Sequence, residues 1–231
     1  MIYDCFTYFN ERAMLEYRLN YLAGIVDRFV IVEGTLNFQG EPKELSQFPL
    51  GFPITHIQVT LNSHPSHSFE NESKQRDAIL RGLTGLKDDD LVLLGDLDEI
   101  PRREDIRSVD VPTTFLQEYY KYNSYRVFHK YNKEPEEWPG TVILPGVQLS
   151  QPQFVRGQRF YNAKIKNGGW HYSWFGDWEI IQQKLRATSH IDLNTDKNRD
   201  RERFYALLER GIDPLDNSKE LRRITTAVNS W

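Results

Sequence analysis

The sequence predicts an α/β fold, in which a mostly parallel central sheet is flanked by helices. A strand–helix–strand pattern fills the first 33 residues. The apolar runs FVIVE (29–33) and LVLLGD (91–96) each end in a carboxylate, and uninterrupted apolar runs are typical of parallel strands buried on both faces. The chain has 231 residues, which is enough for one large domain with a buried core.

The first elements form one βαβ unit. Residues 2–9 predict a strand, and Asn10 is the expected N-cap of a helix over 11–25. The helix is predicted because leucines and a valine recur every three or four residues, at Leu15, Leu19, Leu22 and Val26. The second strand is 29–33, so the connection between the two parallel strands should be right-handed.

The next segment leads to a second buried strand. Residues 34–68 are rich in Gly, Pro, Ser, Asn and His, and only 54–60 predicts a strand there. A helix is expected over 70–83. The following strand covers 91–101 and ends at Pro101, which cannot donate to a sheet ladder.

The second half of the chain is less regular. Residues 115–128 predict one or two strands, and 129–146 predict a loop because they contain three prolines. A helix should begin near Asp177, and another should cover 201–211, with Gly211 closing it.

We expect a single domain over 1–231 without a linker. The chain changes character near 105–112, between a first part of about 1–105 and a second part of about 106–231.

Composition excludes several protein classes. The net charge is −4, from 29 basic and 33 acidic residues, which argues against nucleic-acid binding by charge alone. Cys5 is the single cysteine, so an intramolecular disulfide and a cysteine-based zinc site are excluded. No apolar run approaches the roughly 20 residues of a membrane span, and the first residues do not resemble a signal peptide. These features favour a soluble, cytoplasmic protein.

The most informative stretch is Asp96-Leu97-Asp98-Glu99, at the end of the second apolar run. Residues i and i+2 of a strand point to the same face, so Asp96 and Asp98 should project together where open α/β sheets bind ligands. Unpaired charges there would be costly, and a hard divalent cation such as Mg²⁺ or Mn²⁺ would neutralise them and hold a diphosphate. The alternative is an acidic turn that caps a following helix.

Two motifs carry a family resemblance. GDLDEIP (95–101), followed later by GGWHYSWF-x-x-x-E-x-x-x-x-K (168–184), resembles glycosyltransferase family 17. The similarity extends over most of the chain and includes FVIVE and GEPKEL (40–45). Its single matching positions are Glu72, Arg76, Trp170, His171, Ser173, Glu179 and Lys184.

The resemblance implies a GT-A-like, Rossmann-like fold, a UDP-sugar donor such as UDP-GlcNAc, dependence on Mn²⁺ or Mg²⁺, and inversion at the anomeric carbon. Residues of about 1–105 would then bind the nucleotide-sugar and the metal, and residues of about 106–231 would bind the acceptor. The sequence departs from the animal enzymes of the family because it shows no N-terminal membrane anchor or stem. A glycan, lipid-linked or small-molecule acceptor is therefore expected rather than a Golgi N-glycan.

Site roles follow from this comparison and from residue chemistry. Asp98, Asp96 and His171 are the candidate metal ligands, with His190 as a rival to His171. The donor is expected to meet Glu33, Arg76, Asp77, Asp96, Lys184 and Trp170. Each of these residues has a structural alternative. Glu33 could be a salt-bridged strand end, and Arg76, Asp77 and Lys184 could be ordinary charges on a helix surface. The histidines and Trp170 could serve core packing.

An inverting transfer needs a base, and a carboxylate is the usual choice. Glu179 is preferred because it matches the family pattern, and Asp177 and Glu99 are the alternatives. Asp177 would equally serve as a helix N-cap.

Three other functions stay open. A nucleotidyltransferase would use the same acidic pair, but no glycine-rich phosphate loop is present. A glycosyltransferase acting on modified nucleic-acid bases could use the basic groups at 102–103, 156–166 and 222–223. A non-catalytic carbohydrate-binding protein would use the aromatic second half.

Overall fold

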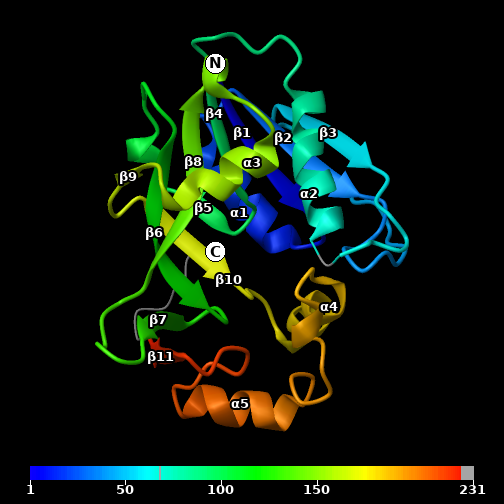
Figure 1. Ribbon diagram of the computed structural model, residues 1–231, viewed down its shortest axis with the longest axis vertical. Coiled ribbons are helices and arrows are strands. Elements are labelled where there is room, and N and C mark those ends of the chain that lie inside the picture. Colours follow the sequence, from blue (N-terminus) through cyan, green and yellow to red (C-terminus); the bar gives the residue numbers. More distant parts are fainter. Residues whose placement is uncertain (68, 225–231) are drawn as a thin grey trace.

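The computed structural model describes residues 1–67 and 69–224. Their strands form one eleven-stranded sheet, with the main order β11-β7-β6-β8-β4-β1-β2-β3 (Figure 1). The strands are β1 Ile2–Tyr8, β2 Arg28–Gly34, β3 Ile54–Val59, β4 Leu91–Asp96, β5 Glu99–Pro101, β6 Thr113–Lys121, β7 Tyr125–His129, β8 Glu137–Pro145, β9 Ala163–Ile165, β10 Gly169–Ser173 and β11 Lys219–Arg223. The α-helices are α1 Arg12–Leu22, α2 Glu70–Asp77, α3 Pro152–Gly157, α4 Trp178–Ala187 and α5 Arg201–Glu209.

The predicted βαβ unit is present. β1 pairs in parallel with β2 on one side and with β4 on the other, and β2 pairs in parallel with β3. Helix α1 begins one residue later than expected, with Glu11 at the N-cap position, and the Asn10 side chain instead donates to Gln183 Oε1 at 2.8 Å. The helix ends at Leu22, because Gly24 follows with φ +80°.

Alternate residues of the parallel strands face two separate cores. On one face, Phe6, Ile31 and Leu93 pack with the apolar side of α1. On the other face, Cys5 and Val30 belong to the core that also takes in residues of α3 and of the 3₁₀ turn Ala78–Gly82 after α2. The strands are therefore buried on both faces, as their uninterrupted apolar runs predict.

The prediction of a mostly parallel sheet was wrong, because the sheet is mixed. Strand β8 lies between β4 and β6 and is antiparallel to both. It occupies the segment predicted as a loop from its prolines. Pro145 is its last residue, and Pro139 lies opposite Leu116, beside a shift in the β6–β8 register. Prolines are tolerated at such positions, so the buried run TVIL (141–144) forms a strand.

A third apolar cluster lies in the part of the molecule that is drawn at the bottom of Figure 1. It joins β6, β7 and β11 to helices α4 and α5. Helix α4 begins as predicted after Asp177, whose side chain accepts a hydrogen bond from the Ile180 amide at 3.0 Å. Helix α5 is followed by Gly211 with φ +69°. Strands of both predicted halves thus belong to one sheet, and residues 225–231 of the expected domain lie outside the described part.

Candidate functional site

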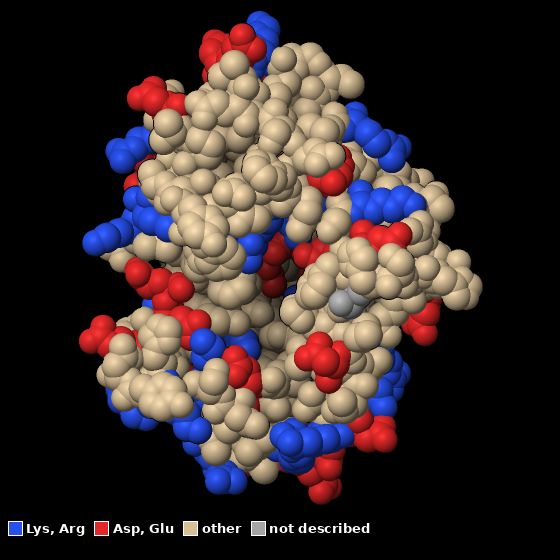
Figure 2. All heavy atoms as spheres, viewed as in Figure 1, with Lys and Arg blue, Asp and Glu red and all other residues tan. Residues whose placement is uncertain are grey.

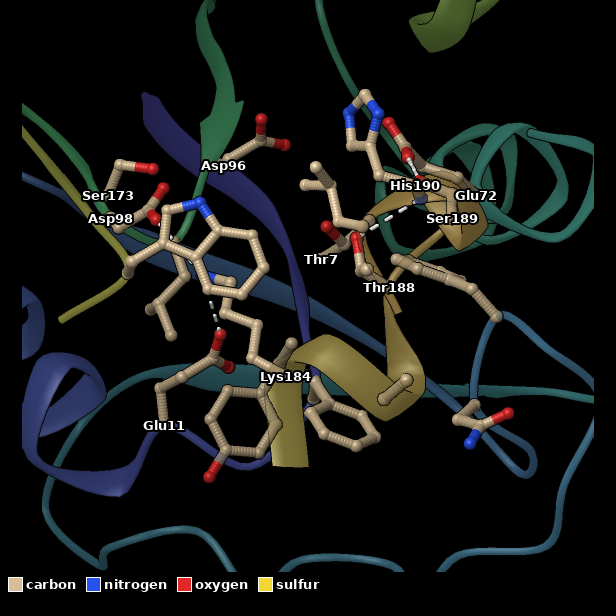
Figure 3. Close-up of a pocket in the computed structure, with 18 of the residues that line it drawn as sticks. Thr7, Glu11, Glu72, Asp96, Asp98, Ser173, Lys184, Thr188, Ser189 and His190 are labelled. Atoms are coloured by element: carbon tan, nitrogen blue, oxygen red, sulfur yellow. Dashed lines mark hydrogen bonds and ion pairs between the residues drawn. The ribbon is translucent and has the colours of Figure 1, made fainter. Parts of the chain in front are cut away.

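A pocket of about 500 Å³ lies at the carboxyl ends of β1, β2 and β4. Figure 2 shows a hollow in the middle of the molecule with acidic and basic side chains inside it. The lining residues Thr7, Gly34 and Asp96 come from the three parallel strands, and Ser173 and Lys184 come from β10 and α4 (Figure 3). Both predicted halves of the chain therefore contribute to it, at the sheet edge where open α/β folds bind ligands.

The acidic motif forms a tight turn between β4 and β5. β4 ends at Asp96 and β5 begins at Glu99, so Asp98 lies in the turn itself. The fully buried Arg18 holds this turn: its Nη1 donates to the carbonyl oxygens of Asp96, Leu97 and Glu99 at 2.8, 3.1 and 2.8 Å. Its Nε and Nη2 donate to the buried carboxylate of Asp4 at 2.8 and 2.7 Å.

Asp96 is held by two arginines. Arg76 Nη1 lies 2.6 Å from its Oδ1, and Arg156 Nη2 lies 3.1 Å from its Oδ2. Burial alone would raise the pKa of Asp96, but the two guanidinium groups outweigh it and hold that pKa far below its usual range. The carboxylate is therefore ionised and already neutralised.

Asp98 has different partners, on the other side of the turn. Lys184 Nζ lies 3.4 Å from its Oδ2, and His171 Nε2 lies 3.6 Å from its Oδ1. Burial raises the pKa of Asp98, but the charges of Lys184 and His171 lower it further than burial raises it. Lys184 also lies 3.5 Å from Glu11 Oε1, and despite burial the two carboxylates raise its pKa.

His171 is fixed by aromatic packing. Its ring stacks on Tyr119, with centroids 4.9 Å apart and an interplanar angle of 8°. Its Nδ1 is buried and has no hydrogen-bond partner among the described residues. The imidazole is thus oriented toward Asp98 by packing rather than by a second hydrogen bond.

Asp98 and His171 fit a divalent cation as two neighbouring donors. No group of three or more His, Cys, Asp or Glu side chains that could hold a metal occurs in the described residues. Mg²⁺ and similar ions commonly bind one or two carboxylates together with substrate phosphates, so an open two-donor set is sufficient. Asp96 does not fit this role, because both its oxygens accept from guanidinium groups.

The far wall of the pocket joins α2 to the end of α4. Glu72 accepts a hydrogen bond from Arg76 Nη2 at 2.9 Å and from Ser189 Oγ at 2.6 Å. His190 follows Ser189 and also lines the pocket, on the side away from Asp98 (Figure 3). The rival histidine therefore lies apart from the pair Asp98 and His171.

Comparison with known proteins identifies the family. The family model of glycosyltransferase family 17 matches residues 1–217. The chain belongs to glycosyltransferase family 17. Membership supports a glycosyltransferase activity, with a sugar donor and an acceptor. No curated protein matches the chain.

Among solved structures, the chain is similar to the 2-C-methyl-D-erythritol 4-phosphate cytidylyltransferase of Francisella tularensis. The TM-score is 0.36 at 9% identity, over 71% of this chain and 89% of that one. No helix in residues 1–67 and 69–224 is long and apolar enough to span a bilayer.

Three residues predicted to meet the donor of this transferase do not line the pocket. Glu33 is fully buried, where its carboxylate accepts from Lys43 and from the Ser46 amide. Asp77 accepts from the Gln153 amide at 2.8 Å. Trp170 lies against the guanidinium of Arg102, 4.7 Å from the ring centroid.

The three carboxylates predicted as the base also lie outside the lining. Glu179 is exposed in the first turn of α4, and five residues of helix place it about 140° around the axis from Lys184. Asp177 caps the same helix. Glu99 is fully buried and accepts from the Asp96 amide at 3.0 Å and from Trp138 Nε1 at 2.6 Å.

Sequence reasoning missed Arg18 and the buried pair of Lys121 and Asp213, of which Lys121 lines the pocket. The signal for Arg18 was present, because position 18 falls on the apolar face of the helix that Leu15 and Leu22 define. A charge in an apolar stripe indicates a buried partner. No comparable local pattern marks Lys121, whose partner is 92 residues away.

Proposed function

We propose that this family 17 glycosyltransferase transfers a sugar, GlcNAc from UDP-GlcNAc, to a hydroxyl of a glycan, lipid-linked or small-molecule acceptor, with inversion. The observation that carries the proposal is the convergence of Asp98, His171, Lys184 and Arg76 on one pocket at the carboxyl edge of the parallel strands. Cations and a carboxylate–imidazole pair are the groups that a nucleoside diphosphate and its metal ion require.

The charge balance of the pocket supports a metal-dependent reaction. Among the described residues, the lining contains four cationic and five carboxylate side chains, a net charge of −1. These are Lys43, Arg76, Lys121 and Lys184, against Glu11, Glu72, Asp96, Asp98 and Asp216. A diphosphate adds two negative charges, and a divalent cation restores the balance. Mn²⁺ or Mg²⁺ at Asp98 and His171 would stabilise the charge of the departing diphosphate.

Lys184 and Arg76 are proposed to position that diphosphate. Lys184 Nζ lies between Asp98 and Glu11, at 3.4 and 3.5 Å, so a small rotation of its side chain can direct the ammonium toward a phosphate. Arg76 is fixed by Glu72 and Asp96 at the opposite wall. The two cations therefore face the ligand from two sides.

In addition to Glu179, two further carboxylates are proposed as candidates for the catalytic base. Glu11 and Asp216 line the pocket and have no arginine partner among the described residues. Glu11 approaches from the start of α1, and Asp216 comes from the acceptor half. Either would accept the proton of the acceptor hydroxyl as it attacks the anomeric carbon.

The test is a thermal-shift titration with UDP-GlcNAc, UDP-glucose, UDP-galactose and GDP-mannose, each with Mn²⁺ and with EDTA. A ligand that binds only the native state raises the unfolding midpoint. We expect a metal-dependent rise for UDP-GlcNAc that Asp98→Asn abolishes and that Asp110→Asn, an exposed acid outside the pocket, retains. A folded protein whose midpoint responds to none of the four donors refutes the proposal.

A further inference from the structure

Helix α3 and the 3₁₀ turn that continues it, Gln158–Phe160, present aromatic side chains to solvent. Phe154, Phe160 and Tyr161 are 61%, 54% and 84% exposed. The amide of Gln158 bonds to the carbonyl of Phe154 and that of Tyr161 to the carbonyl of Gln158, so the segment stays helical throughout. At about 100° per residue, Phe154 and Tyr161 lie about 20° apart around the helix axis, and Phe160 lies about 100° from Tyr161.

Other side chains of the same helix contact residues of the candidate site. Gln153 Oε1 accepts from Arg76 Nε at 2.8 Å, and Arg156 Nη2 reaches Asp96 at 3.1 Å. Helix α3 thus carries both the exposed Phe154 ring and side chains that contact Arg76 and Asp96 of the site. In Figure 2 a broad uncharged area covers the position that α3 has in Figure 1, directly above the hollow.

The segment of the chain that contains these rings is basic. No Asp or Glu occurs between Glu137 and Asp177, although the chain has 33 acidic residues. The basic residues within this interval are Arg156, Arg159, Lys164 and Lys166. Arg159 lies over the Phe160 ring at 4.2 Å, and its Nε is buried without a hydrogen-bond partner in the described part of the chain.

We propose that this surface, defined as Phe154, Phe160 and Tyr161 with Arg159, Lys164 and Lys166, docks on an anionic lipid bilayer. Aromatic rings are favoured at the boundary of headgroups and acyl chains, and arginine and lysine add attraction to anionic headgroups. Docking there holds the pocket close to the membrane and gives it access to acceptors carried on lipids. The binding step requires no donor, metal or acceptor, so it stands apart from the proposed function.

A second copy of the chain is a poorer occupant of the same surface. A two-fold contact over this surface would place the same basic patch of both copies against each other, with like charges in proximity. The acid-free interval contains no carboxylate to compensate. Anionic headgroups supply that compensation.

The experiment is co-sedimentation of the full chain with vesicles of phosphatidylcholine alone and of phosphatidylcholine with 30% phosphatidylglycerol, at low and high salt. We expect binding to the anionic vesicles, weakened by salt. Phe154→Ser/Tyr161→Ser should lower the partition coefficient by about tenfold or more, since it removes the inserted apolar area. Lys166→Glu should also lower it. Tyr131→Ser, which changes a ring that is 96% exposed elsewhere, should leave it unchanged.

Thermal unfolding and the donor titration should be the same in the double variant and the parent, which separates this proposal from the proposed function. The proposal is overturned if the folded parent ignores anionic vesicles, or if the double variant binds them as the parent does. It is also overturned if size-exclusion chromatography shows a dimer that the double variant dissolves.

Discussion

Replacing Arg18 with methionine should destabilise the fold more than any surface change. Arg18 is fully buried and makes five hydrogen bonds, two to the Asp4 carboxylate and three to carbonyls of the acidic turn. Removing one partner of a buried ion pair costs about 3–5 kcal/mol, because the other charge is left uncompensated. With a urea m-value of about 3 kcal/mol/M, a loss of 4 kcal/mol lowers the midpoint by about 1.3 M.

Urea unfolding followed by tryptophan fluorescence measures this loss. Arg12→Met is the matched control, because Arg12 lies on the same helix in a half-exposed pair with Glu16, and such pairs contribute about 1 kcal/mol or less. Arg18→Met/Asp4→Asn should cost less than the sum of its single changes, since no unpaired charge remains. Equal midpoints for Arg18→Met and Arg12→Met would refute this account of the turn.

Three further outcomes are expected. Burial raises the pKa of Asp98, but Lys184 and the adjacent imidazole lower this pKa more than burial raises it. Ionised Asp98 therefore stabilises the fold above about pH 4, and this stabilisation is lost as the pH falls below that value. Asp98→Asn should therefore flatten the acid limb of a plot of unfolding free energy against pH. Lys184→Met should weaken binding of the UDP-sugar but strengthen binding of free Mn²⁺, both by calorimetry, because it removes a cation that competes for Asp98. The catalytic base can be identified by comparing three variants, Glu11→Gln, Asp216→Asn and Glu179→Gln. The change at the base should lower kcat by about 10²-fold or more and leave the affinity for the donor unchanged. Equal kcat values in all three variants and the parent would exclude all three carboxylates.

The parallel part of the sheet could be predicted because its signals are local. Residues 2–34 contain complete strand and helix patterns, and 91–96 form a buried run. Strand β8 could not be predicted, because its two prolines, with Pro135 just before it, indicate a loop to any local reading. What makes 137–145 a strand is its place between β4 and β6, where 142–144 become fully buried.

The site was partly predictable for the same reason. The motif at 96–99 locates the acids, and Lys184 and His171 indeed lie beside Asp98. Arg156 could not be found, since it reaches Asp96 from a helix 60 residues away. Helix geometry alone, however, shows that Glu179 and Lys184 of one helix cannot face the same point.

The structure changes the argument for a metal. The sequence suggests that two unpaired carboxylates need a divalent cation, but Arg76 and Arg156 already neutralise Asp96, and Lys184 neutralises Asp98. The two carboxylates are therefore already compensated by cationic side chains of the chain itself. A divalent cation competes with the Lys184 ammonium for Asp98. A bound diphosphate would form an ion pair with this ammonium and so remove the competition. Metal and donor should consequently bind with positive coupling, each raising the affinity for the other by the same factor.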